Sequence, residues 1–281
     1  MFKILENEEL APGVKKFTIM APRIAKRAIA GQFFILRIDE RGERIPLTLY
    51  KWNPTKGTIS FIFKEVGLTT KRLGMLKEGN YILDVVGPLG HVPELKHYGE
   101  VAVVAGGVGI ASAYPRIEAL RSVNNRLVAI YGAKTASELI LVDELKAVTD
   151  ELIICTDDGS EGLKGFTSQI LEGLLIKGRK FDLVFAVGPA LMMRAVAEVT
   201  RSRNVKTLVS LNPIMVDGTG MCGTCRVSVG GETKFGCVDG PEFDAHEVDF
   251  NELLARLRAY YKEEQLALED SERRSEGETH D

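Results

Sequence analysis

Between residues 101 and 210, short apolar runs alternate with longer amphipathic stretches, and this alternation constrains the fold more than any other feature. Strands that alternate with helices form βαβ units, which build a parallel sheet covered by helices on both faces. The pattern predicts strands at 101–105, 127–131, 152–156, 183–187 and 206–210, and helices around 112–123, 141–148, 168–176 and 191–201. Residues 99–210 are therefore expected to form a doubly wound α/β domain.

The N-terminal third has a different pattern. Apolar or alternating runs at 14–19, 32–38, 45–50, 58–63 and 81–86 are separated by turn residues such as Gly31, Asn53-Pro54 and Gly79-Asn80. Short strands at this spacing are typical of a sandwich or barrel, so residues 1–98 are expected to form an antiparallel β domain of one of these two kinds. Residues 211–266 are expected to hold a cysteine segment and a helix over 248–266, and residues 267–281 a disordered tail.

Composition and length narrow the class of protein. The 281 residues suffice for two domains and a small appendage, and the net charge of −3 predicts neither a nucleic acid nor a membrane as partner. No apolar run approaches the roughly 18 residues of a transmembrane helix. The start of the chain, from Met1 to Glu6, lacks the hydrophobic region of a signal peptide. Because three of the four cysteines cluster, no disulfide framework is expected, and a cytoplasmic location is predicted.

The cysteine segment carries the most specific chemistry. Asp217, Cys222, Cys225 and Cys237 follow the spacing D-x4-C-x2-C-x11-C, with glycines interleaved. Plant-type [2Fe–2S] sites have C-x4-C-x2-C and a further cysteine, so only the first ligand differs, a carboxylate in place of a thiolate. Glycine permits the tight backbone that wraps a cluster. These four residues are predicted to ligate a [2Fe–2S] cluster.

Two other interpretations of these cysteines stay open at this point. Three cysteines with a carboxylate also fit structural zinc, and C-x2-C alone can be a redox dithiol. The fourth cysteine, Cys155, lies in the apolar run 152–155 and is expected to be a buried small hydrophobic residue.

Three loops are candidates for a dinucleotide site. The run Gly106, Gly107, Val108 and Gly109 follows the first parallel strand and precedes a helix, where backbone amides can cradle a pyrophosphate. Two later loops, with Asp157, Asp158 and Gly159 and with Gly188 and Pro189, follow other strands, and ligands bind at the carboxyl ends of strands in open α/β sheets. The turn is not a G-x-G-x-x-G fingerprint, because Ser112 holds the last position. Each loop has a packing or simple-turn alternative.

Motifs of the N-terminal domain suit a flavin dinucleotide. Arg44 lies on an expected strand with Pro46, Leu47 and Thr48, and a guanidinium pairs with phosphate through two hydrogen bonds. A hydroxyl or amide at Thr48 could approach the edge of the flavin ring. Downstream, the run 67–70 offers small residues and amides for phosphate. Taken alone, these residues indicate only a strand and a loop.

The ordered set of motifs resembles the ferredoxin–NADP reductase superfamily over residues 1 to about 260. It comprises R-x-P-L-T at 44–48, G-L-T-T at 67–70, D-V-V-G-P-L-G at 84–90, the turn at 106–109 and G-P-x-x-M-M at 188–193. The added cysteine segment resembles the branch that includes the electron-transfer subunit of dihydroorotate dehydrogenase. Within that branch, the chain resembles the small subunits of electron-bifurcating NADH-dependent reduced ferredoxin:NADP oxidoreductases, because Asp217 stands in place of the first cysteine. Ser112, where the superfamily often has proline, and the bulky Tyr50 and Trp52 depart from the pattern.

The resemblance implies an FAD-binding antiparallel β-barrel over residues 1–98 and an NAD(P)-binding α/β domain over residues 99–210. It also implies a flavin and iron–sulfur oxidoreductase subunit that moves electrons between NAD(H), through FAD, and a [2Fe–2S] cluster. NAD(H) is preferred weakly over NADP(H), because Lys134 is the only basic residue near a possible 2′-phosphate site. Thr48 would orient the reacting edge of the flavin. The residues expected to hold FAD are Arg44, Pro46, Leu47, Thr48, Ile62, Phe63, Lys64, Gly67, Thr69 and Thr70.

The resemblance also implies that this chain is one subunit of a larger complex. A larger flavin and iron–sulfur subunit would form a heterodimer with this chain and connect it to ferredoxin. The alternatives are the electron-transfer subunit of dihydroorotate dehydrogenase, the diaphorase subunit of a hydrogenase and, from a different class, a zinc-stabilised binding protein.

Overall fold

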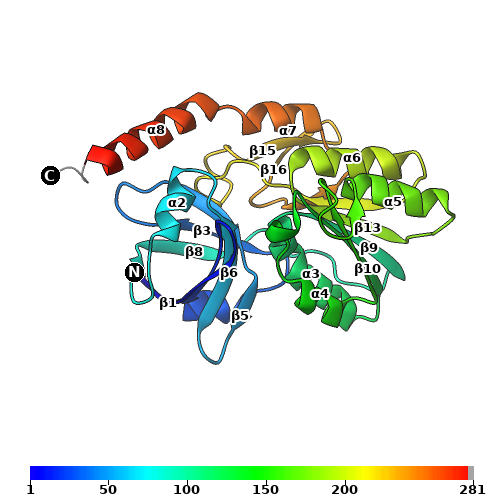
Figure 1. Cartoon of the computed structure of the whole chain (residues 1–281), viewed down its shortest axis with the longest axis horizontal. Helices are drawn as coiled ribbons and strands as arrows, with labels where there is room; N and C mark the ends of the chain where they lie inside the picture. Colours follow the sequence, from blue (N-terminus) through cyan, green and yellow to red (C-terminus); the bar gives the residue numbers. More distant parts are fainter. Residues whose placement is uncertain (278–281) are drawn as a thin grey trace.

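The computed structural model describes residues 1–277, which form a β-barrel, an α/β domain and a C-terminal segment that contacts both (Figure 1). Within these residues no helix is both long and apolar enough to cross a lipid bilayer.

The barrel is built from two antiparallel sheets, with strand orders β5-β6-β2-β1-β7 and β4-β3-β8. Phenylalanines fill its core: Phe61 packs edge-on against Phe34, with ring centroids 5.1 Å apart, and also contacts Phe17, at 5.9 Å. The elements are β1 (Phe2–Ala11), β2 (Val14–Met20), α1 (Pro22–Ala25), β3 (Phe33–Arg37), β4 (Arg44–Thr48), β5 (Lys51–Asn53), β6 (Thr58–Lys64), α2 (Leu68–Gly74), β7 (Tyr81–Ile82) and β8 (Asp84–Leu89).

The barrel differs from expectation in two places. Strand β1 escapes the sequence pattern because charged residues interrupt its apolar ones and only Ile4 and Ala11 are buried. The run from Gly67 to Thr70, expected as an open loop, begins helix α2.

The α/β domain has the strand order β12-β11-β10-β9-β13-β14-β17, in which all pairs but the last are parallel. Helices α3 and α4 cover one face and α5 and α6 the other (Figure 1). The elements are β9 (Glu100–Gly106), α3 (Gly109–Ser122), β10 (Arg126–Ala133), η1 (Ala136–Glu138), α4 (Val142–Val148), β11 (Glu151–Thr156), β12 (Leu163–Lys164), α5 (Thr167–Ile176), β13 (Leu183–Val187), α6 (Ala190–Arg201) and β14 (Thr207–Ser210).

The winding of this sheet reverses between β9 and β13. The chain moves outward from β9 through β10, β11 and β12, and then returns to add β13 and β14 on the other side of β9. Such a switch point opens a crevice at the carboxyl ends of the two central strands. The turn after β9 and the turn after β13 both lie there.

The C-terminal segment is woven into both domains. It contains a hairpin of β15 (Arg226–Val229) and β16 (Glu232–Phe235), joined by Gly230 and Gly231 with positive φ as such a tight turn requires. Strand β17 (Glu242–Asp244) then pairs antiparallel with β14 and completes the sheet. The segment is therefore not an independent appendage.

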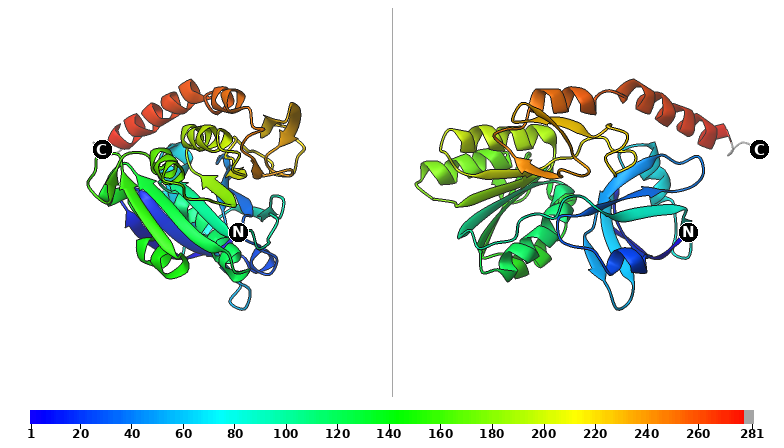
Figure 2. Two further views of the ribbon diagram at one scale, coloured as in Figure 1. Left: turned by 90° about the vertical axis from the view of Figure 1, so that its right-hand side faces the viewer. Right: turned by 180° about the vertical axis from the view of Figure 1, so that it is seen from behind.

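The end of the chain forms two helices where one was expected. Helix α7 (Phe250–Leu257) begins at Asp249, whose carboxylate accepts hydrogen bonds from two backbone amides, and it buries Phe250 and Leu253. Helix α8 (Tyr261–Gly277) follows after a break and passes beside α2 of the barrel (Figures 1 and 2). The expected disorder is not observed over 267–277, and residues 278–281 lie outside the described residues.

Buried contacts join the barrel to the α/β domain. Tyr50 is buried and packs on Tyr114 of α3, with ring centroids 5.3 Å apart, so its ring is part of the interface rather than an exposed surface for stacking. Ile62 and Val14 belong to the same apolar cluster as the α3 face of the sheet. Lys64 Nζ also forms an ion pair with Glu138 Oε2 at 3.1 Å. The barrel therefore holds a defined position against the switch point.

Candidate functional site

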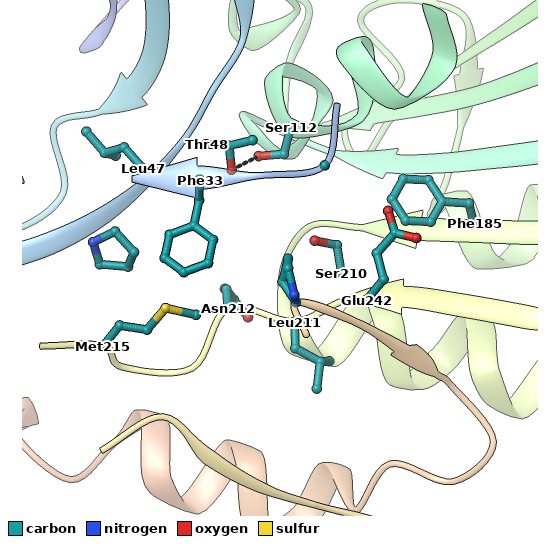
Figure 3. Close-up of a pocket in the computed structure, with 13 residues that line it drawn as sticks. Phe33, Leu47, Thr48, Ser112, Phe185, Ser210, Leu211, Asn212, Met215 and Glu242 are labelled. Atoms are coloured by element: carbon teal, nitrogen blue, oxygen red, sulfur yellow. Dashed lines mark hydrogen bonds between the residues drawn. The ribbon is translucent and has the colours of Figure 1, made fainter. Parts of the chain in front are cut away.

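A cavity lies where the barrel, the α/β domain and the C-terminal segment meet (Figure 3). Thr48, at the end of β4, faces Ser112 of α3, and the Ser112 hydroxyl donates a hydrogen bond of 2.9 Å to Thr48 Oγ1. The cavity measures about 100 Å³, less than the roughly 300–1,000 Å³ of typical ligand pockets, so it has room for only part of a cofactor-sized ligand. Its lining is Gly31, Phe33, Pro46, Leu47, Thr48, Ser112, Phe185, Ser210, Leu211, Asn212, Met215, Pro241 and Glu242.

Arg44 is suited to an anionic ligand. Its Nε atom is buried and has no hydrogen-bond partner in the protein. A buried guanidinium N–H without a partner is costly, and a phosphate oxygen would satisfy it. Arg44 lies on the same strand as Pro46, Leu47 and Thr48, which line the cavity. The structure therefore brings these four predicted flavin residues together.

Other predicted flavin residues are already engaged. The Thr70 hydroxyl accepts hydrogen bonds from the amides of Val66 and Gly67. The Gly67 amide was expected to be free to bind phosphate, and in the structure it is not. The Thr69 hydroxyl donates to Glu43 Oε2 at 2.8 Å. These contacts stabilise the start of α2.

The strand β6 residues occupy three different environments. Phe63 is buried in the barrel core and packs edge-on against Phe17 at 5.2 Å. Ile62 packs into the domain interface, and Lys64 is held by Glu138. The side chains of Ile62 and Phe63 thus contribute to packing, which leaves their backbone as the part that can reach a ligand.

The glycines at the switch point permit close packing and an open turn. A Cβ atom at Gly109 would lie 2.8 Å from the Val187 carbonyl oxygen, and one at Gly106 would lie 2.7 Å from Met192 Sδ. Gly107 has φ of +54°, and nothing lies within 4 Å of where its Cβ would be. Helix α3 begins at Gly109, three residues earlier than predicted, with Val108 as its N-cap. The turn thus presents open space beside backbone at the start of a helix, which suits a pyrophosphate.

The turn after β13 closes the other side of the crevice. Gly188 has φ of +154°, and a Cβ there would lie 3.1 Å from the Gly106 amide nitrogen. Pro189 is the N-cap of α6. The loop after β11 lies at the same edge of the sheet, two strands from β9.

That third loop is a tight turn. Asp158 Oδ1 accepts hydrogen bonds from the Ser160 amide and hydroxyl, which lower the pKa of the carboxyl, and Gly159 adopts φ of +80°. The Asp157 amide donates to the Ala133 carbonyl at 3.1 Å. Both carboxylates are exposed, and the contacts of Asp158 hold the turn in shape.

Two of the predicted cluster ligands lie together. The Sγ atoms of Cys225 and Cys237 are 3.2 Å apart, both buried and free of any disulfide. Burial and the neighbouring thiol raise the pKa of Cys237 to about 12, so a metal ion would be needed to hold both as thiolates. This pair of adjacent sulfurs suits a shared iron.

The other two predicted ligands lie in the glycine-rich loop. The Asp217 carboxylate accepts hydrogen bonds from the amides of Thr219, Met221 and Cys222, which lower the pKa of its carboxyl. Cys222 is exposed, and contacts with Thr224 lower the pKa of its thiol. Within residues 1–277, no three side chains of histidine, cysteine, aspartate or glutamate lie close enough together to hold a metal ion. The four side chains are thus chemically suited to a cluster, with Cys225 beside Cys237 and Asp217 beside Cys222, while the two pairs are not gathered into one site.

The cysteine pair is continuous with the cavity. Phe33 and Met215, which line the cavity, belong to the same buried apolar cluster as Cys225 and Cys237. A Cβ at Gly218, which has φ of +76°, would meet Ile35 of β3 at 2.8 Å, so the loop packs closely on the barrel. The cysteine site and the interdomain cavity are thus separated only by packed side chains.

Several lining residues escaped sequence reasoning. Ser112 stood out only as a departure from proline, although it bonds Thr48 across the domain boundary. Phe33 and Met215 give no sequence signal beyond apolarity. Glu242 follows the last cysteine by five residues, but only the pairing of β17 with β14 carries it to the cavity.

Comparisons with known proteins agree with this geometry. Residues 212–249 match the family model described as the iron–sulfur cluster binding domain of dihydroorotate dehydrogenase B. A Thermotoga maritima homologue of the electron-transfer subunit of dihydroorotate dehydrogenase B (NAD(+)) is 48% identical, covering 95% of this chain and 94% of its own. The Clostridium perfringens electron-transfer subunit is 30% identical, covering 88% and 97%.

Solved structures extend the comparison. A chain of the NADH-dependent reduced ferredoxin–NADP oxidoreductase, studied for flavin-based electron bifurcation, superposes with a TM-score of 0.91 at 47% identity and covers 96% of this chain and 97% of its own. Phthalate dioxygenase reductase, at 18% identity and a TM-score of 0.61 over 81% and 85%, shares the fold alone. The fold expected from sequence is confirmed, and the chain belongs to the family of dihydroorotate dehydrogenase B electron-transfer subunits and their homologues.

Proposed function

We propose that this chain is a flavin and iron–sulfur electron-transfer subunit that passes electrons between NAD(H) and a [2Fe–2S] cluster by way of FAD, and on to a larger partner subunit. The observation that carries the proposal is the apolar cluster in which Cys225 and Cys237 contact the residues of the interdomain cavity. This packing supports an electron path from the interdomain cavity to the cysteine site.

The protein groups bind and orient. Arg44 would pair with the flavin pyrophosphate through its unsatisfied Nε, and Thr48 and Ser112 would hydrogen-bond the reacting edge of the ring. FAD supplies, when bound, the conversion between two-electron hydride chemistry and single electrons. Tyr50 and Tyr114 are buried against each other in the interface between the barrel and α3, which fixes Thr48 and Ser112 relative to each other.

The nicotinamide dinucleotide is assigned to the switch point. Gly106, Gly107, Val108 and Gly109 would cradle the pyrophosphate, with Gly188 and Pro189 opposite and Asp157, Asp158 and Gly159 at the rim. The open space beside Gly107 supports this assignment. NAD(H) is proposed over NADP(H), because Lys134 is the one basic residue in the stretch between β10 and α4.

Asp217, Cys222, Cys225 and Cys237 are proposed to hold the [2Fe–2S] cluster. The match of residues 212–249 to an iron–sulfur binding family supports this assignment over zinc. The similarity to the NADH-dependent reduced ferredoxin–NADP oxidoreductase supports electron bifurcation, with ferredoxin reached through the partner. The second candidate is an electron-transfer role toward dihydroorotate, which the Thermotoga maritima and Clostridium perfringens relatives support.

Purification from the native source with cofactor and iron analysis tests the proposal. The expected result is a complex that contains FAD and a [2Fe–2S] signal by EPR after reduction, with a larger flavin and iron–sulfur subunit. Copurification of a dihydroorotate-oxidising subunit would favour the second candidate. Stoichiometric zinc without flavin or iron would refute both.

A further inference from the structure

Glu242 is a buried carboxylate that borders two cavities. It lines the interdomain cavity beside Phe185 and Ser210 (Figure 3), and it also lines a second, outer cavity of about 230 Å³. Its side chain is only 10% exposed. The β17–β14 pairing sets this position, because it carries the C-terminal segment back across the edge of the sheet.

Arg116 is the ion-pair partner of Glu242, but it leaves one oxygen of the carboxylate without a hydrogen bond. Arg116 Nε lies 3.1 Å from Glu242 Oε1, but neither atom makes a well-directed hydrogen bond. The Arg116 side chain is 3% exposed, and its Nη2 atom donates a hydrogen bond of 2.7 Å to the Glu94 carbonyl oxygen. Burial disfavours the charged form of the carboxylate, whereas its protonation would leave the buried Arg116 charge without a counter-ion, so the two effects on the proton affinity of Glu242 oppose each other.

The two cavities differ in their titratable groups. Among the described residues that line the interdomain cavity, Glu242 is the one with an acidic or basic side chain. The outer cavity is lined by His91, Glu94, Tyr98 and Lys206 as well, and all but the half-buried Tyr98 are exposed. Burial raises the pKa of Glu242 above its ordinary value, and the Arg116 charge opposes this rise. Glu242 thus stands between a cavity without other proton acceptors and one that reaches water.

Electron transfer from NADH leaves a proton to be removed. In overall balance, NADH becomes NAD⁺, one proton and two electrons. The C4–H bond of the dihydronicotinamide breaks with its electron pair, and the two electrons then leave singly through the cluster to a one-electron acceptor. The hydrogen nucleus remains behind as a proton in the interdomain cavity.

We propose that Glu242 is the proton-transfer group of this cavity. Its carboxylate forms an O–H bond with the proton left at the flavin edge, and that bond then breaks as the proton passes to water in the outer cavity. Arg116 positions the carboxylate, and His91, Glu94, Tyr98 and Lys206 are the titratable groups that face the exit. This inference rests on the proposed function, because it requires NADH oxidation at the interdomain cavity.

Proton release can be timed against electron flow. Stopped-flow mixing of the FAD- and cluster-loaded protein with NADH and ferricyanide, in weak buffer with a pH-indicator dye, follows both. In the unsubstituted protein one proton per NADH is expected to appear in step with flavin reoxidation. In Glu242→Gln, flavin reduction by NADH is expected to be unchanged, while reoxidation and proton release slow by about 10²-fold and gain a solvent deuterium isotope effect.

Controls separate this inference from the proposed function. Glu247→Gln, at an exposed glutamate of the same segment, should release protons normally. If Glu242→Gln leaves Arg116 unpaired and the protein misfolds, the double variant Glu242→Gln with Arg116→Met removes both charges and gives the same test. Failure of NADH to bleach the flavin in the unsubstituted protein refutes the proposed function. Normal bleaching with unchanged proton release in the Glu242 variants overturns the proton-transfer role.

An infrared titration of the oxidised holoprotein gives a readout without turnover. A protonated-carboxyl C=O band should appear as pH falls, shift at once in D₂O and be missing in Glu242→Gln but present in Glu247→Gln. Absence of a Glu242 band across the pH range in which the protein stays folded would show a locked ion pair and overturn the proposal.

Discussion

Substitution of Gly107 by valine tests the dinucleotide turn, because two separate effects can be worked out from the structure. Gly107 adopts φ of +54°, and nothing lies within 4 Å of its missing Cβ. The left-handed conformation costs an ordinary L-residue about 1–2 kcal/mol, and no clash adds to that cost. The free energy of unfolding should therefore fall by about 1–2 kcal/mol.

The second effect concerns the ligand. The open space beside Gly107 is where the pyrophosphate is proposed to approach the backbone, and the valine side chain would fill it. Loss of one charge-assisted hydrogen bond costs about 1.5–3 kcal/mol, which weakens NADH binding by roughly 10- to 100-fold. FAD and the cluster should stay bound, because their proposed residues lie on other elements.

Gly178 provides a matched control for Gly107. It follows α5 with φ of +86°, and it also has nothing within 4 Å of a built Cβ. Gly178→Val should therefore lose similar stability in denaturant unfolding but bind NADH normally. Flavin bleaching at graded NADH concentrations measures the affinity in both variants. If Gly107→Val bleaches at the rates and concentrations of Gly178→Val, the turn is not part of the dinucleotide site.

Three further predictions concern other parts of the molecule. Arg44→Ala should lose FAD on dialysis with at least about tenfold weaker retention, because a phosphate would lose a bidentate partner, whereas the exposed Arg41→Ala should keep it; full retention in Arg44→Ala would remove Arg44 from the site. Asp217→Cys should keep a cluster with a changed reduction potential in an EPR-monitored titration, and an unchanged potential would argue that Asp217 is not a ligand. Burial holds the pKa of His246 below its ordinary value of 6.5, so the native state binds fewer protons than the unfolded state and the free energy of unfolding should fall as pH drops below 6.5. His246→Gln should flatten that decline in denaturant melts, and an equally steep decline would assign it to other groups.

Local patterns in the sequence were enough to predict most elements. Strands β9, β11, β13 and β14 and helices α4, α5 and α6 follow from runs of apolar residues, because side-chain periodicity is a property of neighbouring positions. The glycines at 106, 107, 109 and 188 marked the switch point, since close backbone packing or positive φ excludes larger residues there. The spacing of Asp217 and the three cysteines likewise needed no tertiary information.

The tertiary structure decided what those patterns could not reach. Strand β1 is too charged to show a period and is a strand only because β2 and β7 pair with it. The apolar positions after Val248 predicted one helix. The structure has two, because α7 packs on α6 and α8 extends past it toward α2, and the helical conformation is interrupted between them. The hydroxyls of Thr69 and Thr70 were predicted to bind a ligand, but in the structure they form hydrogen bonds with Glu43 and with backbone amides at the start of α2.

The site itself depends on contacts between residues far apart in the chain. The hydrogen bond from Ser112 to Thr48 spans 64 residues, and Glu242 reaches Arg116 only because β17 returns to the edge of the sheet. Local periodicity carries no information about which strand lies beside which, since strand order follows from the burial of whole faces against one another. The sequence by itself therefore determined the elements, the glycine turns and the ligand spacing, whereas only the tertiary structure placed the cysteine pair, the interdomain cavity and Glu242 in one continuous site.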